Sequence, residues 1–137
     1  MKSGGVIKNE GTVEINDSNF TNNSANYGGV IFNTNILNIG NSSFENNHAS
    51  ASAGAIYNSS KGVVTITGNT TFSGNTHSPN AGGSIPNDIF NVGVLNLQPS
   101  KEETIFFKDG IDGDGGNDHG TLNIDGEGRV RVDTGLI

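Results

Sequence analysis

Short runs of residues that alternate between apolar and polar recur along the chain. One such phrase is GTVEI at 11–15, which returns as NILNI at 35–39, GVVTI at 62–66, GVLNL at 93–97 and GTLNI at 120–124. This alternation is typical of a β-strand with one buried face. It predicts two inward columns, which are Val13, Leu37, Val64, Leu95 and Leu122, and Ile15, Ile39, Ile66, Leu97 and Ile124. The polar residues between them are expected to face outward.

A second phrase ends with an isoleucine, a large residue and an asparagine. It reads GGVIKN at 4–9, GGVIFN at 28–33 and AGAIYN at 53–58, with NDIFN at 87–91 as a looser copy. We expect the isoleucines of these phrases to face inward, namely Ile7, Ile31, Ile56 and Ile89. Lys8 must then face outward, because an unpaired lysine is too costly to bury in an apolar core. The same outward position holds Phe32, Tyr57 and Phe90, which form either a ladder that shields the sheet or a stripe that binds a sugar or a protein partner.

A third phrase begins with phenylalanine and ends three residues later with asparagine. It reads FTNN at 20–23, FENN at 44–47 and FSGN at 72–75, with FFKD at 106–109 as a degenerate copy. We expect the first phenylalanine of each copy to be an inward anchor, namely Phe20, Phe44, Phe72 and Phe106. The positions three residues later hold Asn23, Asn47, Asn75 and Asp109. Asparagine suits a tight turn, and identical amides stacked on one another can form a hydrogen-bonded ladder.

The three phrases recur in a fixed order with a period of about 24 residues, which is the signature of a solenoid. Each repeat supplies three short strands, so the fold class is all-β, and the architecture is a single-stranded parallel β-helix of about four to five rungs. Residues 1–137 then form one β-helix domain, with regular rungs over 4–75 and looser rungs over 76–137. The segments 76–86, 98–104 and 109–120 interrupt the pattern and are expected to be surface loops.

Composition narrows the classes of partner. The formal net charge of −7 argues against binding to nucleic acid or to an anionic membrane surface. No segment reaches the roughly 18 apolar residues of a membrane-spanning helix, so we expect no membrane insertion by this segment. The chain has no cysteine, which excludes a disulfide framework. The first ten residues, MKSGGVIKNE, lack the apolar region of a signal peptide, and we expect a piece of a longer repeat array.

The GG-[AV]-I phrase followed by F-x-x-N resembles the repeats of the polymorphic outer-membrane proteins, which are autotransporter adhesins. The residues that carry the resemblance in one copy are Gly28, Gly29, Val30 and Ile31, with Phe44 and Asn47. The resemblance implies a right-handed β-helix that is part of a passenger at the bacterial cell surface or outer membrane, or secreted. It also implies an adhesin or a passive stalk, with a host glycan or surface protein as partner. Uncapped end rungs would allow end-to-end self-association.

Catalysis is not expected. Polysaccharide-processing enzymes also use parallel β-helices, but they need carboxylates that converge in one cleft. The outward positions of the regular phrases supply only Glu14 and Glu45. The alternative, a carbohydrate-active β-helix, would have to place its site in the loop around residues 109–118.

The same loop holds the only candidate metal ligands that we single out. Asp109, Asp112, Asp114 and Asp118 are weak calcium candidates, because closely spaced carboxylates suit Ca²⁺. No bidentate glutamate follows at the spacing of a calcium loop, so a solvated turn is the preferred interpretation. The three histidines are isolated from one another, which argues against zinc. We therefore expect neither a metal nor a cofactor.

Overall fold

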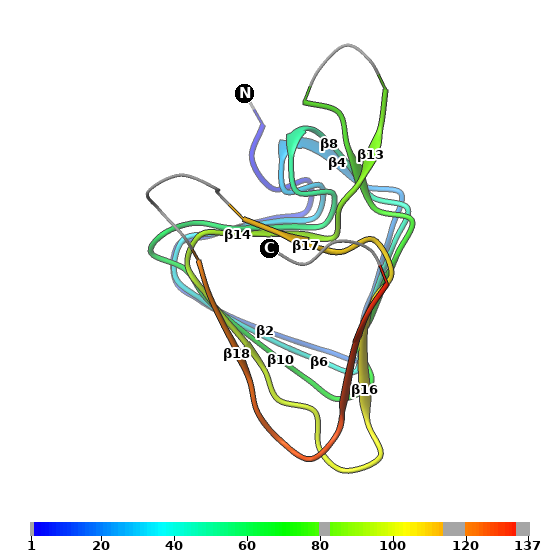
Figure 1. The fold of residues 1–137 in the computed structure, drawn as a ribbon. Coiled ribbons are helices and arrows are strands. Elements are labelled where there is room, and N and C mark those ends of the chain that lie inside the picture. Colours follow the sequence, from blue (N-terminus) through cyan, green and yellow to red (C-terminus); the bar gives the residue numbers. More distant parts are fainter. Residues whose placement is uncertain (1, 80–82, 114–119, 134–137) are drawn as a thin grey trace.

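The computed structural model describes residues 2–79, 83–113 and 120–133 and consists of short strands in four sheets (Figure 1). Sheet 1 contains β1 (Ile7–Asn9), β5 (Ile31–Asn33), β9 (Ile56–Asn58), β14 (Ile89–Asn91) and β17 (Ile111–Asp112). Sheet 2 contains β2 (Thr12–Asn16), β6 (Ile36–Gly40), β10 (Val63–Thr67), β15 (Val94–Leu97) and β18 (Thr121–Ile124). Sheet 3 contains β3 (Asn19–Thr21), β7 (Ser43–Glu45), β11 (Thr71–Ser73), β16 (Thr104–Phe107) and β19 (Arg129–Val132). Sheet 4 contains β4 (Ser24–Tyr27), β8 (His48–Ser52), β12 (Thr76–His77) and β13 (Ile85–Pro86).

The chain winds as a parallel β-helix. Apart from β12 and β13, consecutive strands belong to different sheets. Each strand of sheets 1, 2 and 3 pairs in parallel with the equivalent strand of the next turn. In Figure 1 these three sheets form the sides of a triangle, and β4, β8 and β13 lie outside one corner. We number the turns as coils, the third being β9–β12 and the fourth β14–β16. The predicted fold class is confirmed, with about four turns between the first and last strands of a column.

The inward columns of sheet 2 are confirmed. Leu37 pairs in register with Val64, and Val64 with Leu95, and all three side chains are fully buried. The second column is buried in the same way from Ile15 to Leu97. At the last strand, β18, the predicted core residue Ile124 keeps the register but is 59% exposed.

Sheet 1 carries the predicted isoleucine column and extends it by one residue. Ile31, Ile56 and Ile89 are fully buried, and Ile7 is partly buried against them. Ile111 of β17 pairs with Ile89 and is 2% exposed. The segment 109–120, which we expected to be a loop, therefore contributes a strand to the coil.

The phenylalanine stack follows the prediction in three coils and departs from it in the fourth. The rings of Phe20, Phe44 and Phe72 stack with centroid separations of 5.0 and 4.7 Å, and the next ring, 4.7 Å beyond Phe72, is that of Phe107. The prediction of an inward Phe106 is wrong. β16 aligns Phe72 with Phe107, so the alternation of the strand turns Phe106 outward, where the Arg131 guanidinium lies 4.9 Å from its ring centre.

Sheet 4 was not predicted, and the first three coils therefore contain four strands rather than three. Its strands are rich in Ser, Ala, His and Asn and show no clear apolar alternation. Parallel backbone pairing between β4, β8 and β12 holds them in place. β13 pairs antiparallel with β12, so the segment 76–86 is not wholly a loop. Within the described residues there is no helix, and hence none that could span a membrane.

Candidate binding face and buried polar ladders

The three aromatic residues singled out from the sequence lie together on the outer side of sheet 1. The rings of Phe32 in β5 and Tyr57 in β9 stack with their centres 4.9 Å apart and their planes 8° apart. The ring of Phe90 in β14 stacks on Tyr57 at 5.1 Å and 22°. Parallel pairing at each coil places these side chains directly above one another. The expected ladder is therefore present.

A fourth aromatic residue, Tyr27 in β4, joins this cluster from sheet 4. Its ring meets Tyr57 edge to face, with the centres 5.6 Å apart and the planes at 84°. Sequence reasoning missed Tyr27 because it ends a strand that shows no apolar alternation. We call Tyr27, Phe32, Tyr57 and Phe90 the aromatic face.

Stacking limits how the aromatic face can bind. All four residues are half-buried, and Tyr57, the middle ring of the stack, has its two faces covered by Phe32 and Phe90. A sugar ring stacks on an open aromatic face, whereas ring edges are suited to contact with apolar or aromatic protein side chains. The column ends in charge, because Lys8 aligns with Phe32 and Asp112 with Phe90. The aromatic face is thus a strip of ring edges between one basic and one acidic residue.

A buried asparagine ladder runs along the corner between sheets 1 and 2. Asn9 Nδ2 donates to Asn33 Oδ1 at 2.8 Å, Asn33 to Asn58 at 2.9 Å, and Asn58 to Asn91 at 2.8 Å. The same amides also donate to backbone carbonyls, as Asn58 does to that of Val94 at 3.0 Å. The sequence analysis did not predict this ladder. Its sequence signature is the asparagine that ends every copy of the second phrase, in IKN, IFN, IYN and IFN.

The asparagine ladder predicted from the third phrase is present at the end of sheet 3, and we call it the second ladder. In the fourth coil an aspartate takes the place of the asparagine. Asn23 Nδ2 donates to Asn47 Oδ1 at 3.1 Å, and Asn47 Nδ2 to Asn75 Oδ1 at 3.0 Å. Asp109 takes the next ladder position and accepts the backbone N–H of Asn75 at 3.1 Å. The Asn75 amide instead donates to Asp88 Oδ1 at 2.8 Å. The left-handed backbone of this turn lies one residue before the ladder position, for example at Asn46, with φ 57°, rather than at Asn47.

Asp88 is a fully buried carboxyl group inside the coil. Its register position follows Val30 and Ala55 in the two preceding coils, which are both fully buried apolar residues. Its Oδ2 accepts the backbone N–H of Asp109 at 2.9 Å. Burial in this apolar surrounding, with a further contribution from the neighbouring Asp109 carboxyl group, raises the pKa of Asp88 from 3.8 to about 8. The folded chain therefore holds the proton of Asp88 much more tightly than an exposed aspartate would.

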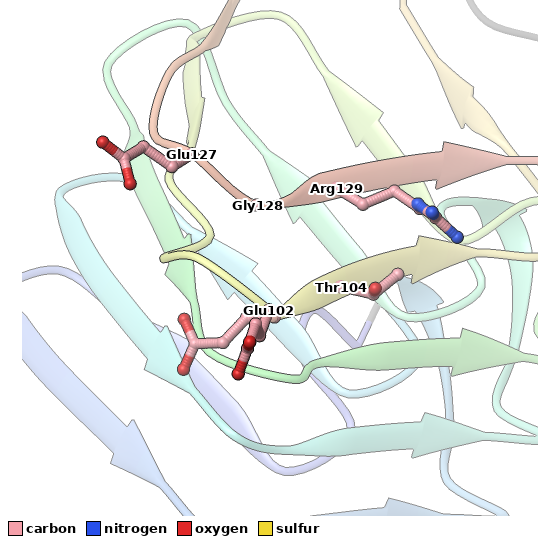
Figure 2. A pocket seen from close by; sticks show the side chains of 6 residues that line it. Glu102, Thr104, Glu127, Gly128 and Arg129 are labelled. Atoms are coloured by element: carbon pink, nitrogen blue, oxygen red, sulfur yellow. The ribbon is translucent and has the colours of Figure 1, made fainter.

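An open depression of about 390 Å³ lies at the loops before β16 and β19 (Figure 2). It is lined by Glu102, Glu103, Thr104, Glu127, Gly128 and Arg129. In Figure 2 the Glu127 and Glu102 side chains extend to one side, and the Arg129 guanidinium points away from them along its strand. The carbohydrate-active alternative placed its site elsewhere, around residues 109–118, and residues 114–118 lie outside the described residues.

Among the described residues, the aspartates considered as calcium ligands do not lie together. Asp109 belongs to the second ladder, whereas Asp112 faces outward beside Phe90. Asp114 and Asp118 lie outside the described residues. Among the residues that are described, no three acidic or histidine side chains are placed to hold a metal ion. His48 instead contacts the Thr76 hydroxyl through Nδ1 at 2.7 Å.

Comparison with known proteins identifies the repeat. Residues 17–34 and 41–59 match the family model of the Chlamydia polymorphic membrane protein repeat. Searches of curated proteins and of solved structures gave no significant match. The two matched segments contain the F-x-x-N phrases at Phe20 and Phe44 and the glycine phrases that follow them, so the resemblance drawn from these residues is confirmed. Two adjacent segments of the chain are thus similar to the polymorphic membrane protein repeat, and together with the β-helix they fit a surface-exposed, autotransporter-like passenger.

Proposed function

We propose that this chain is a non-catalytic segment of a longer passenger at the bacterial surface, either anchored there or secreted, and that its aromatic face adheres to a partner outside the cell. The observation that carries the proposal is the continuous row of half-buried rings on the outer side of sheet 1. The hydrophobic core does not need these rings, because Ile31, Ile56 and Ile89 already fill the inner side of the same strands. A contiguous apolar strip on an outer surface is typical of an interaction site.

A protein on the host surface suits this strip better than a glycan. The stacked rings offer edges rather than open faces, so they favour apolar and aromatic side chains over sugar rings. Lys8 and Asp112 at the two ends of the column can orient such a partner through charge. The β-helix itself contributes a rigid scaffold that holds successive ring edges in line.

The test is binding of the fluorescently labelled chain to epithelial cells, measured by flow cytometry. We expect Phe90→Ala to lower the apparent affinity at least tenfold, because truncation of an aromatic residue that anchors an interface costs more than about 1.4 kcal/mol. Phe106→Ala is the matched control, since Phe106 is also a half-buried outward phenylalanine but lies on sheet 3. Circular dichroism should show that both variants remain folded.

Treatment of the cells separates the two classes of partner. Loss of binding after protease treatment, with binding retained after enzymatic removal of glycans, would support a protein partner. Dependence on glycans alone would contradict the protein partner while leaving the aromatic face as the adhesive surface. Equal binding of wild type, Phe90→Ala and Phe106→Ala would overturn the aromatic face, and no binding by folded wild type would indicate a passive stalk.

A further inference from the structure

The second ladder ends in a pair of carboxyl groups at the boundary between the third and fourth coils. Asn75, which lies between β11 and β12 of the third coil, uses its side-chain amide to donate to Asp88 at 2.8 Å and its backbone N–H to donate to Asp109 at 3.1 Å. Asp109, which follows β16 of the fourth coil, in turn donates its backbone N–H to Asp88 at 2.9 Å. Asp88 is thus the acceptor that connects the equivalent corners of the two coils.

The surroundings of Asp88 leave its charge uncompensated. Among the described residues, the register neighbours of Asp88 are Ala55 in the coil before it and Gly110 directly before β17, and neither carries charge. The Asn75 amide is neutral, and among the described residues Asp109 is the titratable group that acts on Asp88. The two ion pairs between described residues join Lys8 to Glu10 and Arg131 to Asp133, and neither includes Asp88. Two ionised carboxylates in contact repel each other, whereas a shared proton converts the repulsion into a hydrogen bond.

We propose that Asp88 and Asp109 form a proton-dependent lock between the third and fourth coils, which is closed while the pair holds one proton and is weakened when both groups are ionised. In the closed state Asp88 donates its carboxyl proton to Asp109 and accepts the Asn75 amide and the Asp109 N–H. When the proton is lost, the buried negative charge faces the charge of Asp109 and the coil boundary loosens. The chain would be held most firmly in acidic surroundings and would loosen in alkaline ones.

The sign of the effect on folding follows from the difference in proton binding. The folded chain keeps a proton on Asp88 up to a pKa of about 8, while the unfolded chain releases it near the ordinary value of 3.8. The stabilisation is therefore complete below about pH 4 and is lost progressively as the pH rises toward 8. Across this window Asp88 alone lowers the folding equilibrium constant by up to about tenfold per pH unit.

The experiment is urea unfolding of the chain between pH 5 and pH 9, with Asp88→Asn for comparison. Asparagine keeps the size of the side chain and cannot ionise. We expect the ratio of wild-type to Asp88→Asn folding constants to fall at least 100-fold from pH 5 to pH 9. A ratio that stays constant over this range would overturn the lock.

Asp109→Asn is the second variant, and it keeps Asp88 as the buried acid. It removes the neighbouring charge and supplies an amide donor, so we expect the titration of Asp88, followed by the ¹³C shift of its carboxyl carbon, to move to lower pH. If neither variant folds, the ¹³C titration of the Asp88 carboxyl group in the wild-type chain tests the proposal by itself. An Asp88 carboxyl that is already ionised at pH 6 contradicts the proposal.

Local opening is measured through the Asp109 amide, which donates directly to Asp88. We expect its hydrogen-exchange protection factor to fall at least tenfold more than that of Ile39 in β6 between pH 6 and pH 9. Equal losses at the two amides would show global destabilisation rather than a lock at this boundary. Full restoration of stability at pH 9 by added calcium, reversed by EDTA, would show that a cation rather than a proton closes the pair and would overturn the proposal.

Discussion

At the scale of single residues, buried amides tie each coil to the next. Asn58 is fully buried, accepts from Asn33, and donates to Asn91 and to the Val94 carbonyl. Asn58→Ala leaves two buried neighbours without this partner, and we expect a loss of about 2–4 kcal/mol in the free energy of unfolding. Urea unfolding at fixed pH measures the loss. Asn38→Ala, in the outward column of sheet 2, should change stability by less than about 0.5 kcal/mol, and equal losses in the two variants would contradict the role given to the ladder.

At the scale of elements, the corner that enters sheet 1 depends on the absence of a side chain. A Cβ atom added at Gly29 would lie 2.1 Å from the Gly54 carbonyl oxygen, which is rigid backbone of the next coil. We expect Gly29→Ala to force the coils apart at this corner and to lower the free energy of unfolding by at least about 3 kcal/mol. Gly11→Ala is the control, because a Cβ atom there meets nothing within 4 Å. Thermal melts that lower the Tm equally for both variants would refute this account of the corner.

At the scale of the whole molecule, stability should be graded along the coil. The core side chains of the middle coils, such as Leu37, Val64 and Phe72, are fully buried, whereas Val130 and Val132 of β19 are only partly buried. Because each coil contacts mainly its neighbours, opening is expected to begin where the core is least covered. We expect amide hydrogens of β18 and β19 to exchange at least 100-fold faster than those of β6 and β10 in mass-spectrometric measurements. Uniform exchange along the chain would indicate one all-or-none unit instead.

The repeated coil and most of its inward positions follow from the amino-acid sequence. The alternation in GTVEI and its copies and the fixed Ile and Phe positions specify which side of each strand is buried, because a shift of one residue would turn an apolar column toward water. The same reasoning placed Phe32, Tyr57 and Phe90 on one outer surface. The asparagine of the first ladder was equally regular in the sequence, but periodicity alone does not distinguish a buried amide ladder from an exposed turn.

The contacts between residues of different coils cannot be read from the sequence at the places where the pattern breaks. The register of β16 against β11 selects Phe107 rather than Phe106 for the core, and backbone pairing creates sheet 4 from residues without an apolar period. The meeting of Asp88 with Asp109 depends in the same way on how the segment between Asn75 and Asp88 returns to the coil. These features arise from contacts between residues distant in sequence, whose energies no local pattern encodes, whereas alternation within one strand reports directly on the face that strand buries.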